Sequence, residues 1–111
     1  MADFDLPLVF DDSHRRALKK TIQQALTSPA AYEQLAEECS ELAHAALKLA
    51  RIERGENPTP AMHDLTSWDL KTEFTDILIC AYVLEMTFDN ETFDRKLQRW
   101  CDRLMEVAEN E

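Results

Sequence analysis

The chain has 111 residues, which suits one domain with a modest core, and its 12 basic and 22 acidic side chains give a formal net charge of −10. Because a surface of that charge repels nucleic acid and anionic lipid, we expect neither as a direct partner. No apolar run approaches the roughly 20 residues that span a bilayer, and we expect neither a secretory signal nor disulfides from three widely spaced cysteines, so a cytoplasmic protein is predicted.

The single glycine and four prolines separate amphipathic segments. We therefore predict one all-α domain over residues 1–111, of the four-helix bundle type. Irregular structure is expected for the N-terminal segment 1–12 and for a loop at 55–64. The predicted helices, with approximate limits, are 13–26, 29–54, 66–87 and 90–109.

Capping residues set the limits of the first two helices. Ser13 is the expected N-cap of the first helix. Ser28 followed by Pro29 is typical of a helix start, and Gly55 of a helix end. The second helix should bury a stripe whose members are four and three residues apart. These members are Leu35, Cys39, Leu42, Ala46 and Leu49.

The second half of the chain continues this pattern. Pro58 and Pro60 favour extended backbone before them, which predicts the loop. The third helix contains ILICAYVLEM, apolar almost all round, so we expect it to be the most buried element, between its own bundle and a second subunit. Asp89 or Asn90 should cap the fourth helix. Its apolar residues again step by four and three: Phe93, Leu97, Trp100, Leu104 and Val107.

Two pairs of carboxylates occupy equivalent positions beside the buried stripes. At about 100° per residue, Glu38 lies about 40° and Glu41 about 100° from the stripe of the second helix, and Glu73 and Asp76 have the same two offsets on the third. An antiparallel hairpin would bring all four to one level. Four carboxylates at the edge of an apolar core repel one another unless a cation lies among them. An all-oxygen site favours Mg²⁺ or Mn²⁺, which can also bind substrate phosphate and promote attack of water on a phosphoanhydride.

These residues resemble a known signature. Glu38-x-x-Glu41 followed by Glu73-x-x-Asp76 resembles the E-x-x-E and E-x-x-D motifs of the all-α nucleoside triphosphate pyrophosphohydrolases, the MazG-like superfamily. QLAEECSELAHAALKLARIERGENPTP and EFTDILICAYVLE are similar to its small single-domain bacterial and phage members. The resemblance implies a MazG fold in which the four acids are metal ligands and catalytic residues. It further implies Mg²⁺-dependent cleavage of an NTP or dNTP between the α and β phosphates, giving the monophosphate and pyrophosphate, by a homodimer or a dimer of dimers that cleans the nucleotide pool.

The chain departs from the family pattern in two respects. The gap between Glu41 and Glu73 holds 31 residues, slightly more than usual, and an Asn- and Lys-rich tail motif is missing. Residues that grip substrate are therefore less well defined. Lys48 is the best-placed phosphate contact, Trp68 could stack on a base, and Asp69 could add a ligand, although Lys48 and Asp69 also suit solvated side chains. The base and sugar of the substrate are not specified by any pattern in the sequence.

Two other classes of function are compatible with the sequence. A di-iron bundle needs E-x-x-H on two helices, and Glu41-x-x-His44 is the one match. Alternatively, the protein is a non-catalytic acidic adaptor whose stripes build a dimer, which leaves the matched positions of the two acid pairs as coincidence. Metal-dependent thermal stability distinguishes the enzyme from the adaptor.

Overall fold

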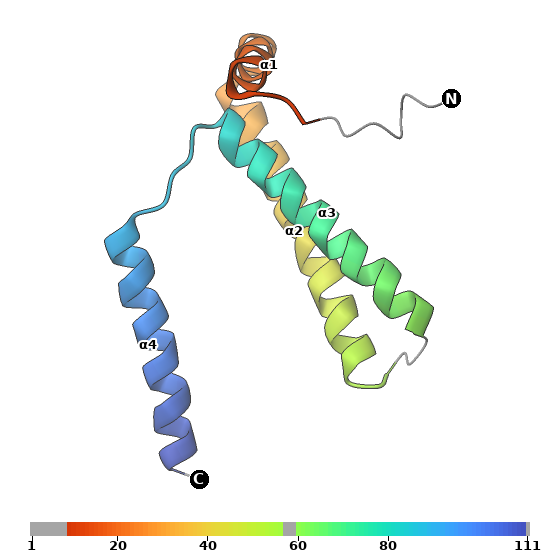
Figure 1. Ribbon diagram of the computed structural model, residues 1–111, viewed down its shortest axis with the longest axis vertical. Helices are drawn as coiled ribbons and strands as arrows, with labels where there is room; N and C mark the ends of the chain where they lie inside the picture. The colour runs from red at the N-terminus through yellow and green to blue at the C-terminus, as the bar shows by residue number, and fades with distance from the viewer. Residues whose placement is uncertain (1–8, 57–59, 111) are drawn as a thin grey trace.

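The computed structural model of the protein describes residues 9–56 and 60–110, which form four helices and no strand (Figure 1). The predicted all-α four-helix fold is thus confirmed. The expected irregularity of residues 1–8 lies outside the described residues. None of the described helices is both long and apolar enough to cross a membrane. The helices are α1 (Asp12–Ala25), α2 (Ser28–Glu53), α3 (Pro60–Val83) and α4 (Asn90–Glu109).

Three helices begin at a side-chain cap. Asp11, Thr27 and Asp89 each accept a hydrogen bond from the backbone N–H three residues further on, which satisfies a free donor of the first helical turn. The cap predicted at Asp89 is confirmed. The caps predicted at Ser13 and Ser28 are wrong, because the preceding Asp11 and Thr27 already accept these bonds and both serines lie inside the helices.

The third helix begins earlier and ends earlier than the predicted 66–87. It starts at Pro60, so the predicted loop at 55–64 is wrong from residue 60 onward. Proline suits the first helical position, where its missing N–H has no partner to lose. At the other end, Glu85 adopts a left-handed φ of 56°, and the Met86 N–H donates to the carbonyl of Ala81, which closes the helix in a Schellman motif.

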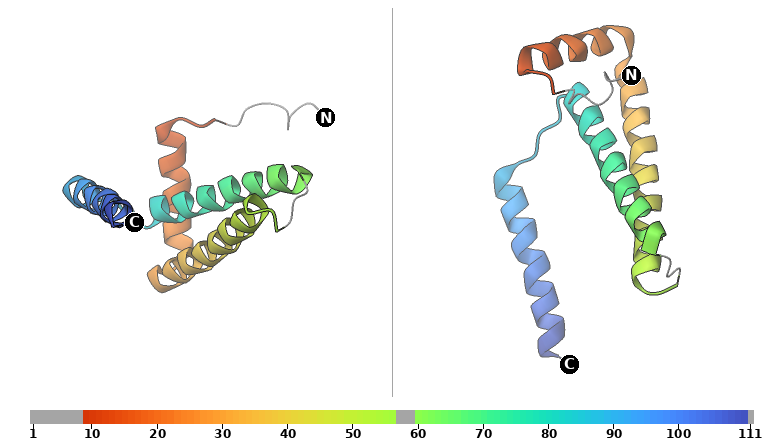
Figure 2. Two further views of the ribbon diagram at one scale, coloured as in Figure 1. Left: turned by 90° about the horizontal axis from the view of Figure 1, so that it is seen from below. Right: turned by 45° about the vertical axis from the view of Figure 1, so that its right-hand side comes forward.

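The helices differ greatly in how much they pack. Antiparallel α2 and α3 lie side by side along most of their length, and α1 crosses the C-terminal end of α3 (Figures 1 and 2). α4 stands apart and packs along none of the other three described helices (Figure 2). The α2–α3 hairpin is therefore the structural centre of the single chain.

The seam between α2 and α3 has the four-three spacing of knobs-into-holes packing. The predicted stripe through Cys39 and Ala46 is off by one residue at these two positions, since both are exposed. The seam uses Glu38 and Ala45 instead, and alanine there leaves room for close approach of α3. The buried or half-buried residues at seam spacing on α2 are Ala31, Leu35, Glu38, Leu42, Ala45, Leu49 and Ile52. Those on α3 are Thr66, Leu70, Glu73, Ile77 and Cys80.

The isolated chain buries few apolar side chains. Within the described part, the buried apolar residues are Ala31, Ala45 and Ile52. Leu78 and Ile79 of the apolar segment ILICAYVLEM remain 53% and 52% exposed. The expectation that this segment is the most buried element is therefore wrong for the single chain, because only one side of α3 faces α2.

Thr66 offers a test of the seam. It is the most buried side chain, 1% exposed, and its hydroxyl has no hydrogen-bond partner among the described residues. We expect Thr66→Val to raise the free energy of unfolding by about 1 kcal/mol, because the buried hydroxyl is removed at nearly constant shape. Thermal unfolding should then move up by about 4 °C.

Thr72→Val is the matched control. The exposed Thr72 hydroxyl donates to the Trp68 carbonyl, so its replacement should change stability by no more than about 0.5 kcal/mol. A Thr66→Val protein that melts below the wild type would show that the hydroxyl has a stabilising partner.

Candidate metal centre

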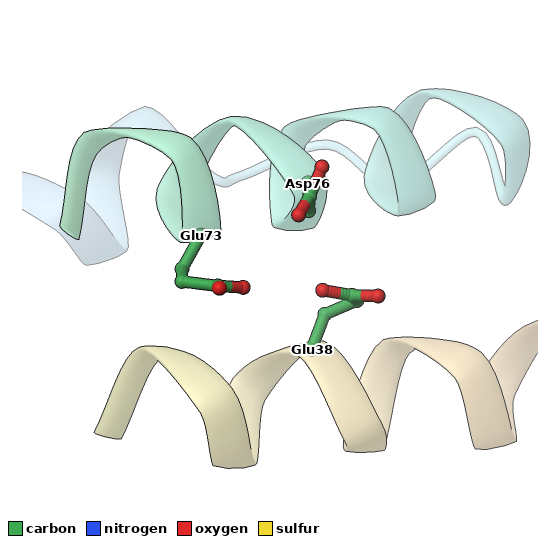
Figure 3. A group of neighbouring side chains, drawn as sticks. All are labelled: Glu38, Glu73 and Asp76. Atoms are coloured by element: carbon green, nitrogen blue, oxygen red, sulfur yellow. The ribbon is translucent and has the colours of Figure 1, made fainter. Parts of the chain in front are cut away.

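Three carboxylates converge at the middle of the hairpin. Glu38 of α2 and Glu73 of α3 reach into the space between the helices from opposite sides, and Asp76 lies one turn further along α3 (Figure 3). One oxygen of each lies within 4.8 Å of the others, and all three residues are half-buried. Ligand oxygens around one Mg²⁺ lie about 3.0 Å apart when adjacent and about 4.2 Å apart when opposite, so the three oxygens would have to move closer together to bind one ion.

No positive side chain in the described part of the chain forms an ion pair with this cluster. Among residues 9–56 and 60–110, none of the ion pairs includes Glu38, Glu73 or Asp76. The Oε2 atoms of Glu38 and Glu73 are buried without a hydrogen-bond partner in the same part of the chain. Buried carboxylate oxygens are costly unless paired or bound to metal, so this donor set fits a hard divalent cation.

The surroundings raise the pKa of Glu38. Loss of solvation is the main cause, and the charges of Glu41 and Asp76 add to it, against a hydrogen bond that Gln34 Nε2 donates to Glu38 Oε1 at 2.8 Å. Desolvation, followed by the charges of Glu38 and Asp76, also raises the pKa of the Cys80 thiol. Both shifts show that negative charge at this place lacks compensation.

Glu41 lies beside the three-carboxylate cluster and is more exposed. A hydrogen bond between the carboxyl groups of Glu41 and Glu73 raises the pKa of Glu41, and the negative charge of Glu73 raises it further. The structure thus brings the four predicted acids into one neighbourhood. Three form the close cluster, and Glu41 joins it through Glu73.

The other candidate residues do not enter the cluster. Lys48 is half-buried on α2, while Trp68 and Asp69 are exposed on α3, with Lys71 Nζ 5.7 Å from the centre of the Trp68 ring. Asp69 is not among the three carboxylates that approach one another. His44, the histidine of the di-iron alternative, is exposed and likewise lies outside this group.

Sequence reasoning missed two residues of the centre. Gln34 precedes Glu38 by one helical turn, and Cys80 follows Asp76 by one turn, so both share a helix face with an acid of the cluster. The only indication in the sequence was this spacing of one helical turn from an acid of the cluster. Neither Cys80 nor Gln34 belongs to the E-x-x-E or E-x-x-D motif identified in the sequence.

No family model matches the chain, and neither a curated protein nor a solved structure matches it. The interpretation of the centre therefore depends on its own geometry and on the motif resemblance.

The first prediction for this centre concerns metal binding. Millimolar Mg²⁺ or Mn²⁺ should raise the thermal midpoint, because an ion that binds only the folded state stabilises it by about 2.7 kcal/mol at 100 times its dissociation constant. Asp76→Asn should reduce the shift. Glu37→Gln, which removes the same charge from an exposed residue next to Glu38, should keep it. An equal shift in both variants would place the ion elsewhere.

The second prediction concerns pH in metal-free buffer. Because the pKa of Glu38 is raised on folding, its contribution to stability is full below about pH 4.5 and is lost as pH rises through the folded value. Glu38→Gln should therefore melt above the wild type near pH 7.5, and the difference should shrink toward about pH 5. Glu37→Gln serves as the control for net charge. A difference that grows on acidification contradicts the assigned cause.

Proposed function

We propose that this protein is a Mg²⁺-dependent nucleoside triphosphate pyrophosphohydrolase of the MazG-like type, with Mn²⁺ as a substitute ion. The observation that favours this function is the pair of buried, unpartnered oxygens on Glu38 and Glu73, next to Asp76. A structural cluster would be expected to contain a lysine or arginine, whereas a metal centre needs these oxygens free. The E-x-x-E and E-x-x-D spacing supports the same conclusion.

The proposed roles follow from position. Glu38, Glu73 and Asp76 would hold the ion, with Glu41 at its margin. When bound, the ion supplies positive charge that polarises the phosphate oxygens of the substrate. Glu41 is exposed and its pKa is raised, so it is suited to accept the proton of an attacking water. That water bonds to phosphorus as the bond to the bridging oxygen breaks, which releases the monophosphate and pyrophosphate.

Substrate contacts and assembly belong to the same proposal. We assign Lys48 to phosphate, Trp68 to base stacking and Asp69 to a supporting position one turn before Glu73. The exposure of Trp68 favours this role over core packing. We further propose a homodimer or a dimer of dimers, because the single chain leaves large apolar side chains exposed on every described helix.

A non-catalytic adaptor is the second candidate, favoured by the unpaired apolar face of α4. An adaptor needs that face but has no use for convergent carboxylates between α2 and α3. The metal-dependent shift in melting therefore separates the two candidates as well.

Turnover tests the enzyme directly. Wild-type protein with Mg²⁺ should release monophosphate and pyrophosphate from at least one member of a panel of NTPs, dNTPs, modified nucleotides and phosphoribosyl-ATP. We expect Glu38→Gln to lower turnover more than about 100-fold, since loss of residues that merely orient metal ligands costs 10–100-fold. Glu37→Gln should retain activity. Near-normal turnover by Glu38→Gln would exclude the assigned centre.

A further inference from the structure

The apolar face of α4 has no partner within the chain. Its residues step by four and three over about four turns, and each is more than half exposed. α4 packs along no other described helix (Figures 1 and 2). The members of this stripe are Phe93, Leu97, Trp100, Leu104 and Val107. Such a continuous stripe on a 20-residue helix requires a cover of similar length.

A second uncovered apolar surface lies between α1 and the C-terminal half of α3. It is a groove of about 510 Å³. Arg15 and Lys19 also line it, so the groove is apolar with basic groups beside it. Its main apolar lining residues are Phe10, Leu18, Ile22, Leu78, Ile79 and Tyr82. The chain therefore has two uncovered apolar features. One is the stripe on α4, called the ridge below, and the other is the groove between α1 and α3.

The exposed area is large enough for a permanent dimer. The chain exposes 9361 Å², while a compact monomer of 12.8 kDa exposes about 6300 Å². The chain therefore exposes more surface than a compact monomer of its mass. Stable interfaces need only about 800 Å² from each partner. A second copy of this chain can accordingly cover both apolar surfaces.

Pairing of α4 with α4 of another copy is disfavoured by charge. Lys96 and Arg103 border the stripe on one side, and Asp94, Cys101 and Ala108 on the other. An antiparallel pair would place Lys96 and Arg103 of the two copies against each other. A parallel pair would set Lys96 beside Cys101 and Arg103 beside Ala108, and neither partner offers an opposite charge. The α4 stripe therefore gains no charge complementarity by pairing with itself.

Packing of α4 into the groove of its own chain is opposed by the end of α3. Lys19 Nζ lies 3.2 Å from Glu85 Oε1, and Gln23 Nε2 donates to the Val83 carbonyl at 2.8 Å. These contacts fix the Schellman turn against α1. The chain then leaves in a direction that separates α4 from α1 and α3 (Figure 2). No α4 residue lines the groove of its own chain in this arrangement.

We propose that two copies exchange their C-terminal helices, with the α4 stripe of each copy seated in the α1–α3 groove of the other. The exchange is reciprocal, so it closes as a two-fold symmetric pair instead of growing into a filament. It covers the ridge and the groove at once. The proposal specifies how copies associate and does not depend on nucleotide hydrolysis, so its test measures mass and not turnover.

A complementation experiment tests the exchange. Trp100→Asp damages the ridge and Leu78→Asp damages the groove, so each variant alone should sediment as a monomer at concentrations where the wild type is a dimer. Mixed in equal amounts, they should form a heterodimer, because one intact ridge meets one intact groove. Gln98→Glu on the polar face of α4 and Thr72→Asp on α3 should leave the wild-type dimer unchanged.

Each other outcome overturns the proposal. A wild-type protein that sediments as a monomer contradicts the proposed exchange. If Trp100→Asp dissociates the pair and Leu78→Asp does not, α4 pairs elsewhere. If both variants are monomeric and their mixture does not form a heterodimer, the α4 ridge of one copy does not bind the groove of the other. Circular dichroism checks that both variants remain helical. If Leu78→Asp unfolds, Leu78→Ala takes its place. The dissociation constant of its homodimer should rise at least tenfold, and mixing with Trp100→Asp should restore association.

Discussion

The close pairing of α2 with α3 is the constraint on which the other features depend. Glu38 lies in the seam between Leu35 and Leu42, so its carboxylate cannot turn to water by rotation of the helix without exposing both leucines. Glu73 is held in the same way from α3. Apolar burial therefore keeps together charges that repel one another. An acidic side chain at a core position lowers the stability of the metal-free hairpin. Such a loss of stability is common where a residue is needed for function.

The same pairing explains why the chain leaves so much apolar surface uncovered. Only one side of α3 faces α2, and the remaining apolar residues of α3 face α1 or solvent. Ala31 and Ala45 in the seam let α2 and α3 approach closely, but their small side chains bury little apolar area. A hairpin of this kind cannot provide the core that a chain of 111 residues needs. In the proposed pair, association of the two copies would be part of folding and not a later addition.

The sequence predicted features that have local causes. The limits of α2 and α4 were predicted to within a residue, because Gly55 and Asp89 act on their own helix ends. The four acids were found by their equal offsets from two stripes. The register of the seam was missed, since Glu38 at a core position contradicts the hydrophobic pattern that the prediction used, and Cys39 beside it fits that pattern. The position of α4 could not be predicted from the sequence either. Its amphipathic pattern shows that its apolar face needs a partner surface, but not which surface that is.

The site and the assembly meet on α3. Asp76 faces the carboxylate cluster, while Leu78 and Ile79, within the next helical turn, line the groove. Metal ligands need positions fixed to a fraction of an ångström, and a helix half-exposed on its other side is poorly restrained. A second copy seated on Leu78 and Ile79 would immobilise the turn that holds Asp76. Occupation of the groove would thus favour the arrangement of carboxylates that binds an ion, even if the partner contributed no ligand.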